Sequence, residues 1–162
     1  MDIEQRKHNK SGSAFLSILS YEDELIESWH IAMIQKLVPC EGLIPNSQCL
    51  LLQVADGRFS FEQKKVAYGY QIISFSKFGR ETLSRIAANK LNSDLVLSHL
   101  CGTRNCCENS HIIIETKLIN DERTHCHWCM RNSKANAGNN GIQLFLASGA
   151  CPHMPKCGSI SS

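Results

Sequence analysis

Apolar residues recur at helical spacing in the N-terminal part of the chain. Between residues 14 and 38 they repeat every three or four positions, which predicts one or two amphipathic helices. Residues 1–12 are mostly polar and are expected to form a flexible tail. Pro39, Gly42 and Pro45 then end the helical pattern, because proline and glycine interrupt helices.

The middle of the chain changes to a pattern typical of strands. Cys49–Val54 is a short apolar run followed by a turn signal, and Phe59–Phe75 contains alternating and aromatic residues. We therefore predict two or three antiparallel strands over residues 49–77. Gly79 ends this run, and Glu81–Lys90 has the spacing of a helix.

A strand, a loop, a second strand and a helix are predicted over residues 95–129. Leu95 leads into His99 as one strand, Ile112–Ile114 forms the next, and Lys117–Cys129 has helical character. Separate strands and helices, with antiparallel sheets, predict the α+β class. The 162 residues suit a single domain, 1–162, with a modest core.

Composition bears on the compartment and on the metals. The chain holds nine cysteines and seven histidines, no secretory signal and no run of apolar residues long enough to span a bilayer. We expect a soluble intracellular protein that does not bind membranes, in which closely spaced cysteines and histidines bind metals rather than form disulfides. The net charge of +2 permits a nucleic-acid partner without arguing for one.

Three potential zinc ligands lie five residues apart in the loop between the predicted strands: Cys101, Cys106 and His111. Thiolates and imidazoles are the ligands that a tetrahedral zinc prefers. A fourth ligand has to come from elsewhere, and Cys49 and Cys40 are the upstream candidates. The alternative is that these are ordinary buried cysteines beside a surface histidine.

A second set of ligands, Cys151, His153 and Cys157, lies near the C-terminus, in a segment (126–157) that contains an insertion between Cys129 and Cys151. Either Cys126 or Cys129 can complete its tetrahedron. The alternative is a disordered tail with incidental cysteines. With all four positions filled by protein, neither zinc would hold a water, so both are expected to be structural.

Two further residues have the chemistry of phosphodiester hydrolysis. The neutral imidazole of His99, on the strand before the first cluster, can take a proton from water. The amide oxygen of Asn120, on the following helix, is a hard ligand that suits magnesium. Taken alone, His99 could equally be a structural histidine, and Asn120 an exposed helix residue.

Together these residues form one extended pattern: His99-Leu100-Cys101-x4-Cys106-x4-His111, then Asn120-x2-Arg123-x2-Cys126, then Cys151-x-His153-x3-Cys157. The pattern resembles the His-Cys box of homing endonucleases, which belong to the ββα-metal, or His-Me finger, nucleases. The resemblance implies that His99 is the general base and that Asn120 holds one catalytic Mg²⁺. It also implies two structural zincs, bound by Cys49, Cys101, Cys106 and His111 and by Cys126, Cys151, His153 and Cys157.

The resemblance further implies a double-stranded DNA substrate with a long, nearly palindromic site, cut by a homodimer that is nuclear in a eukaryotic host. An arginine that contacts the phosphate is expected from the sheet region; we place it at Arg80, with Lys77 and Gln71 as alternatives. The predicted sheet would read the major groove, with Lys64, Lys65 and Lys77 as DNA contacts. Because five residues follow Cys157, we expect the insertion or the N-terminal helices to supply the dimer interface.

Three functions remain open from the sequence. The first is a sequence-specific, magnesium-dependent homing endonuclease, and the retention of both His99 and Asn120 favours it. The second is a zinc-stabilised DNA-binding module without activity, or a nonspecific ββα-metal nuclease. The third is a zinc-stabilised interaction domain that does not bind nucleic acids, which the small net charge allows.

Overall fold

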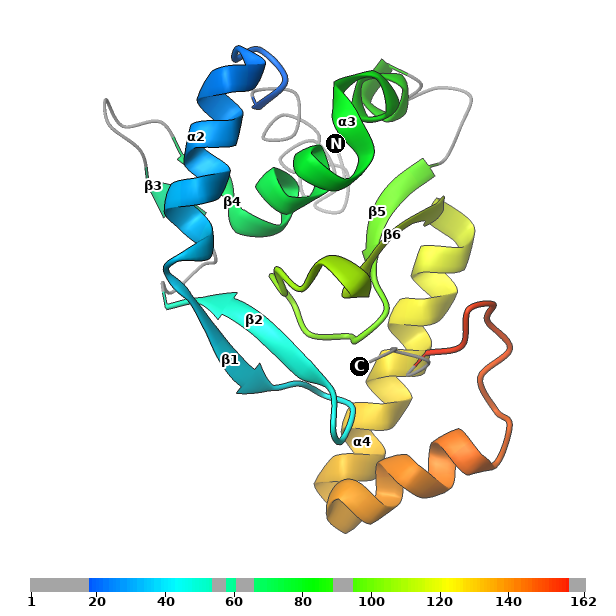
Figure 1. Ribbon diagram of the computed structural model, residues 1–162. Helices are drawn as coiled ribbons and strands as arrows, with labels where there is room; N and C mark the ends of the chain where they lie inside the picture. The colour runs from blue at the N-terminus through cyan, green and yellow to red at the C-terminus, as the bar shows by residue number, and fades with distance from the viewer. Residues whose placement is uncertain (1–17, 54–57, 61–65, 89–94, 158–162) are drawn as a thin grey trace, which may run out of the picture.

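Helices and small two-stranded antiparallel sheets are interspersed along the chain (Figure 1). The computed structural model describes residues 18–53, 58–60, 66–88 and 95–157. Over these residues the strands pair in three two-stranded antiparallel sheets, and the main apolar core forms around the helices α2 and α3. The predicted α+β class is confirmed. None of the helices in the described ranges has both the length and the apolar character that crossing a bilayer requires.

Helix α2 (Asp23–Ile34) confirms a helix in the N-terminal region. Its buried residues Ile26, Trp29 and Met33 follow helical spacing, so one face packs into the core against α3. The predicted tail lies outside the described residues. The predicted helical region extends too far at its C-terminal end, because the chain already enters strand β1 at Leu37.

Strands β1 (Leu37–Glu41) and β2 (Gln48–Leu52) form a hairpin whose register places Cys40 opposite Cys49. Pro39 pairs with Leu50 within β1, which is possible because both strands of a two-stranded sheet have a free edge. The strand predicted from Cys49 onward is confirmed.

The predicted sheet over residues 49–77 is correct only in part. Strands β3 (Arg58–Ser60) and β4 (Val66–Tyr68) pair, but helix α3 (Gly69–Ala88) begins directly after them. The first turns of α3 are buried on nearly all sides, and because the polar residues Gln71 and Ser74 are buried there too, the sequence shows no clear helical period of polar and apolar positions. The aromatic and β-branched residues there suggested strands, and burial overrode that local preference. At Gly79, φ is +78° and the helix kinks.

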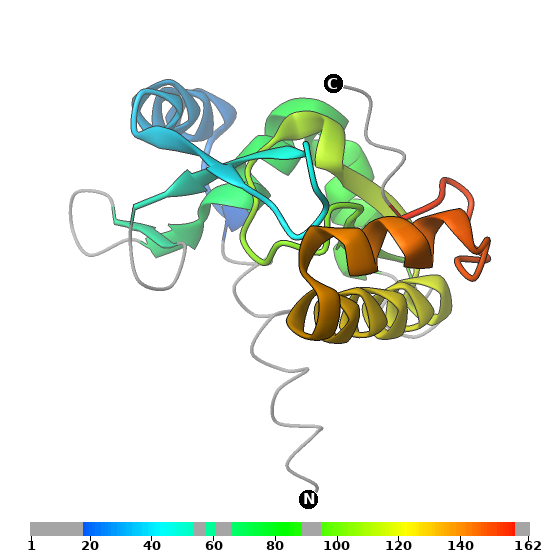
Figure 2. The same ribbon diagram turned by 90° about the horizontal axis from the view of Figure 1, so that it is seen from below.

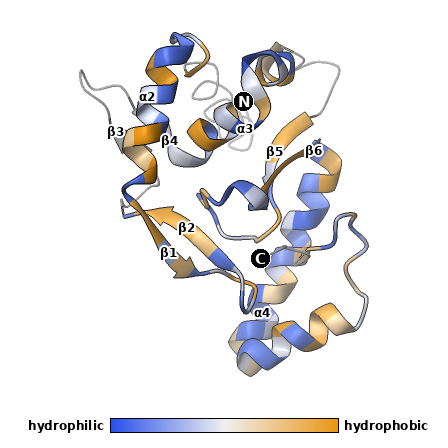
Figure 3. Cartoon of the chain, viewed as in Figure 1, coloured by the Kyte–Doolittle hydropathy of each residue, from blue (hydrophilic) through white to orange (hydrophobic). Residues whose placement is uncertain are grey.

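Strands β5 (Leu95–His99) and β6 (Ile112–Thr116) form the hairpin predicted around the first metal loop, which ends in a 3-10 turn, η2 (Asn109–His111). Their register pairs His99 with Ile112. Helix α4 (Lys117–Ala147) follows at once and runs back along both strands (Figure 1). In Figure 3, β5 and β6 are largely hydrophobic, whereas α4 is mostly hydrophilic.

Helix α4 is much longer than predicted. It bends at Ala137 and Gly138, where the backbone leaves helical geometry, and its second half turns back at an angle to the first (Figures 1 and 2). The two halves touch closely, since a Cβ on Gly141 would lie 2.2 Å from the main-chain oxygen of Ser133. The insertion looked irregular because its Asn, Ser and Gly residues have low helix propensity, but Ile142 is fully buried against the second cluster.

Candidate functional site

The first Cys/His cluster brings β2 to the loop between β5 and β6. Cys49, Cys101, Cys106 and His111 are all buried, and their ligand atoms lie within 4.8 Å of one another. Nδ1 of His111 is 3.8 Å from Sγ of Cys49 and 3.5 Å from Sγ of Cys106. Around a tetrahedral zinc, such atoms are separated by about 3.5–3.8 Å. The geometry therefore fits zinc.

Main-chain hydrogen bonds fix the loop in the shape that this cluster needs. The amide of Leu100 donates to the oxygen of His111 (2.8 Å), which closes the loop at its base. The amide of Cys107 donates to the oxygen of Leu50 (2.7 Å), which joins the loop to β2. As a result Cys49, far away in sequence, lies beside the other three ligands.

The second cluster joins α4 to the C-terminal loop. Cys126 comes from α4, and Cys151, His153 and Cys157 come from the loop; all four are buried and again lie within 4.8 Å of one another. Nδ1 of His153 is 3.3 Å from Sγ of Cys151 and 3.4 Å from Sγ of Cys157. The carboxylate of Glu122 lies 3.9 Å from Nε2 of the same histidine, which is too far for a hydrogen bond, so this buried nitrogen has no hydrogen-bond partner among the residues that the structure describes.

The crowding of buried thiols in both clusters fits a bound cation. In the first cluster, hydrogen bonds from Cys101 and Cys106 lower the pKa of the Cys49 thiol, while Cys101, Cys49 and burial raise the pKa of Cys106. In the second cluster, burial and the neighbouring Cys157 and Cys151 raise the pKa of Cys126. Several buried thiolates repel one another unless a dication neutralises them, so the donor sets fit Zn²⁺.

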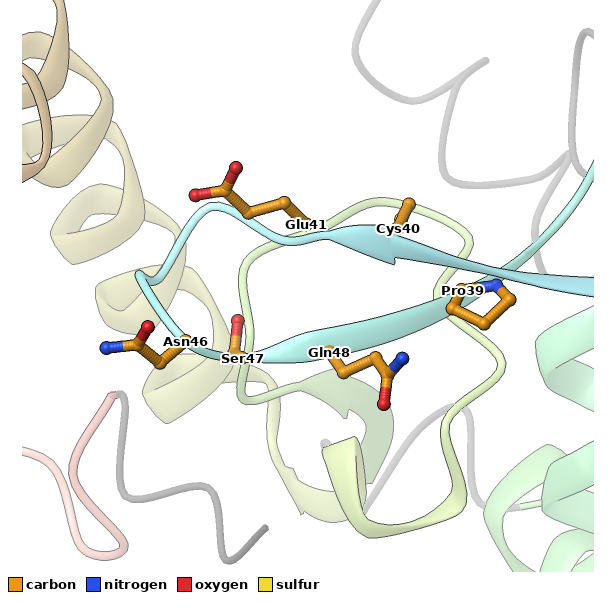
Figure 4. A pocket seen from close by; sticks show the side chains of 6 residues that line it. All are labelled: Pro39, Cys40, Glu41, Asn46, Ser47 and Gln48. Atoms are coloured by element: carbon orange, nitrogen blue, oxygen red, sulfur yellow. The ribbon is translucent and has the colours of Figure 1, made fainter.

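All nine cysteines of the chain are free of disulfides. The three that do not belong to either cluster are Cys40, Cys107 and Cys129. Cys40, the alternative to Cys49, lines a shallow hollow on the β1–β2 hairpin (Figure 4). Cys129, the alternative to Cys126, lies 3.8 Å from Nε2 of His125 on α4. The structure thus places Cys49 and Cys126, rather than Cys40 and Cys129, within the two clusters.

His99 lies at the end of β5, directly beside the first cluster. Its Nε2 is 3.0 Å from the main-chain oxygen of Cys106, and the ring of Tyr70 meets it edge-on, with 5.0 Å between ring centroids. A carbonyl oxygen can only accept a hydrogen bond, so Nε2 carries the proton and Nδ1 keeps its lone pair. Burial lowers the pKa of His99, although its bond to Cys106 opposes this, so the imidazole stays neutral.

Asn120 lies in the first turn of α4, half-buried. Thr116 caps that turn, since its side-chain oxygen accepts a hydrogen bond from the amide of Ile119 (3.3 Å). The main-chain oxygen of Asn120 accepts another from Thr124 (2.9 Å). Because α4 packs on β5, the structure places His99 and Asn120 on the same hairpin-and-helix unit.

Two α4 side chains that the sequence pattern did not single out hold the helix against the first metal loop. His127 is buried and its Nε2 lies 3.1 Å from the oxygen of Leu100, while Arg131 donates to the oxygen of Gly102. Burial lowers the pKa of His127 to about 4, so it is a neutral structural histidine. The sequence gives little sign of this role, because positions 127 and 131 share a helix face with Arg123, whose burial only the structure shows.

Gly102 gives a direct test of this contact. Its φ is +65°, and a Cβ there would lie 2.7 Å from the His127 ring, so Gly102→Ala is expected to destabilise the protein by about 2–4 kcal/mol from backbone strain and overpacking. Gly149 is the matched control: its φ is +70°, but nothing lies within 4 Å, so Gly149→Ala should cost about 1–2 kcal/mol. Chemical denaturation measures both. Equal losses of unfolding free energy in the two variants would show that His127 of α4 does not pack closely against Gly102.

Among the described residues predicted to contact the phosphate or DNA, Arg80 and Lys77 make hydrogen bonds within the protein. Arg80 pairs with Asp23 and donates to main-chain oxygens of Leu19 and Tyr21, near the start of α2. Lys77 donates to the oxygens of Asn109 and Ile112, each at 2.7 Å, and so holds η2 against α3. Gln71 is buried. Lys64 and Lys65 lie outside the described residues.

A strand hairpin closed by one Cys₃His cluster, followed by a helix that contributes to a second, defines a zinc-stabilised ββα unit. The family model described as the zinc-binding loop region of homing endonuclease matches residues 27–161. The chain belongs to this family, which confirms the resemblance seen in its His-Cys pattern. No curated protein sequence and no solved structure matched the chain.

Proposed function

We propose that the protein is a magnesium-dependent endonuclease that cuts double-stranded DNA at a specific site. The observation that carries this proposal is the fixed imidazole of His99, held by the oxygen of Cys106 at the edge of the first cluster. At His99 one ring nitrogen is used for orientation, and the other keeps a lone pair that can accept a proton. This is how a general base is prepared.

In the proposed reaction, Nδ1 of His99 accepts a proton from a water molecule. The water oxygen attacks the scissile phosphorus, a new P–O bond forms, and the bond to the 3′ oxygen breaks. The hydrogen bond to Cys106 and the edge-on ring of Tyr70 keep the imidazole in one orientation throughout. The zincs take no part in these steps, because protein ligands fill all four positions of each cluster.

Asn120 is the residue that would hold the magnesium ion. A single amide oxygen suits a cation that keeps most of its waters and gathers phosphate oxygens. When bound, the ion would stabilise the negative charge that develops on the phosphate and on the leaving oxygen. The Thr116 cap and the packing of α4 on the hairpin give Asn120 a fixed position for this role.

The experiment uses zinc-loaded protein and a library of duplex DNA with randomised sites, incubated with or without Mg²⁺. Cleavage that needs Mg²⁺ and enriches one nearly palindromic sequence is the expected result, and sedimentation of the DNA complex should show a homodimer. Cleavage without sequence preference would instead indicate a nonspecific nuclease. Binding without cleavage at any Mg²⁺ concentration would overturn the proposal and indicate an inactive DNA-binding module.

The pH dependence of cleavage should follow the depressed pKa of His99. A general base works only when neutral, and burial moves the protonation of His99 below the ordinary histidine value of about 6.5. The cleavage rate should therefore be at its full value above the ordinary histidine pKa, and it should fall only when the pH drops through the depressed pKa of His99. The acid limb of log kcat/KM against pH measures it. A midpoint at or above about 6.5 would contradict this assignment.

A further inference from the structure

Arg123 carries a charge in the interior of the protein, where a charge is expensive. Its side chain is 0% exposed and that of Glu115, its partner on β6, is 7% exposed. Nε of Arg123 lies 3.0 Å and Nη2 lies 2.8 Å from the two carboxylate oxygens of Glu115. Burial alone would raise the pKa of Glu115, but the hydrogen bonds from Arg123 outweigh it and lower that pKa, so the pair is ionised.

Stability alone does not account for this pair. Buried ion pairs are often no more stable than apolar side chains of the same volume, because removing two charges from water costs several kcal/mol. The third nitrogen of the guanidinium shows what else it does. Nη1 donates to the main-chain oxygen of Pro155 (2.9 Å) and to Sγ of Cys157 (3.3 Å), a ligand atom of the second cluster.

The side chain of Arg123 therefore contacts both the β5–β6 hairpin and the second cluster. Two of its nitrogens hold β6, which pairs with the strand that ends at His99, and the third holds a sulfur of the second cluster. Arg123 itself lies one helical turn after Asn120 on α4. An N–H···S bond to a zinc-bound thiolate withdraws charge from the sulfur and fixes its direction.

We propose that Arg123 is a positioning residue that couples the second cluster to the ββα unit. The hydrogen bond from Arg123 to Cys157 orients that sulfur and strengthens zinc binding at the second cluster. The two hydrogen bonds from Arg123 to Glu115 set the position of α4, and so of Asn120, against the β5–β6 hairpin. The catalytic part of this inference rests on the proposed nuclease function. The effect on zinc does not, and it can be measured in a protein that cuts nothing.

The test separates positioning from stability by replacing the ion pair with apolar residues. In the double variant Arg123→Met with Glu115→Leu, no buried charge is left unpaired, so the protein should still fold, and its unfolding midpoint should fall only by the amount that weaker zinc binding accounts for. The affinity of the second cluster for Zn²⁺, measured by competition with a chromophoric chelator, should fall about 10–100-fold. With Co²⁺ in place of zinc, the thiolate charge-transfer band of one of the two bound ions should shift.

Arg131→Met is the matched control, because Arg131 also extends from α4 to a metal loop but contacts the main chain of Gly102 rather than a ligand. This substitution should leave the affinity of the second cluster for Zn²⁺ and the spectrum of the cobalt-loaded protein unchanged. For cleavage, the double variant should lower kcat with little change in KM. A stable double variant with natural zinc affinity and an unshifted cobalt band would overturn the inference. If zinc binding weakens while the natural protein cuts no DNA, the nuclease proposal fails and the zinc role of Arg123 stands.

Discussion

Replacing Cys106 with serine is expected to remove one of the two zincs and to leave the protein largely unfolded. A structural zinc contributes about 10–16 kcal/mol of apparent binding free energy, which is comparable with or larger than the entire stability of a small protein, about 5–15 kcal/mol. Cys106 is 0% exposed and belongs to the first cluster. Its loss would leave two buried thiols and an imidazole without a complete tetrahedron.

The next residue gives the control. Cys107 is also buried, at 2% exposed, but its thiol lies in the main apolar core and only approaches the oxygen of Asn105. Cys107→Ser should therefore keep both zincs and lose only about 1–3 kcal/mol for a buried hydroxyl. Zinc content by mass spectrometry and far-UV circular dichroism distinguish the two variants. If Cys106→Ser retained two zincs and its fold, the assigned ligand set would be wrong.

Substituting alanine for His99 should abolish most DNA cleavage while both zincs remain bound. A positioned general base contributes about 10²–10⁴-fold to the rate, and no other described residue is held by the Cys106 oxygen in its place. His99 is not a ligand of either cluster, so the hairpin should survive with a loss of about 1–2 kcal/mol for one hydrogen bond. Single-turnover cleavage in Mg²⁺ measures the loss.

His125→Ala is the comparison for that measurement. His125 is exposed on α4 and stacks on Trp128, with 5.7 Å between ring centroids. Its removal changes neither cluster, so cleavage should stay within a few-fold of the natural rate. If His99→Ala cut DNA as fast as His125→Ala, His99 would not be the general base and the proposed mechanism would fail.

The sequence is most informative where chemistry dictates spacing. Zinc accepts few ligand types and one geometry, so the spacing of Cys101, Cys106 and His111 is enough to predict a metal loop. The strands on either side follow from the loop, since His99 and Ile112 have to approach each other. The choice of Cys49 over Cys40 does not follow from spacing, because the two residues lie directly opposite each other in the β1–β2 hairpin, and the way the whole hairpin packs on the metal loop decides which one joins the cluster.

Local patterns fail where packing on several sides decides the structure. The first turns of α3 resemble a strand because they are buried all round, with the polar residues Gln71 and Ser74 included, so no exposed polar face marks the helix. The second half of α4 resembles a loop because its helix is stabilised by contacts such as that of Ile142 rather than by propensity. The sequence around Arg123 gives no sign that its guanidinium is fully buried, since arginine is usually exposed.

The two clusters also differ in which stretch of chain each one closes. The first joins Cys49 to His111, 62 residues apart, and closing a loop of that length corresponds to about 4 kcal/mol of conformational entropy in the unfolded chain. That loop contains α3, whereas the loop between Cys126 and Cys157 contains the folded-back half of α4. Neither loop encloses the other. Either metal can therefore bind first, and no segment has to thread through a ring that the other metal has already closed.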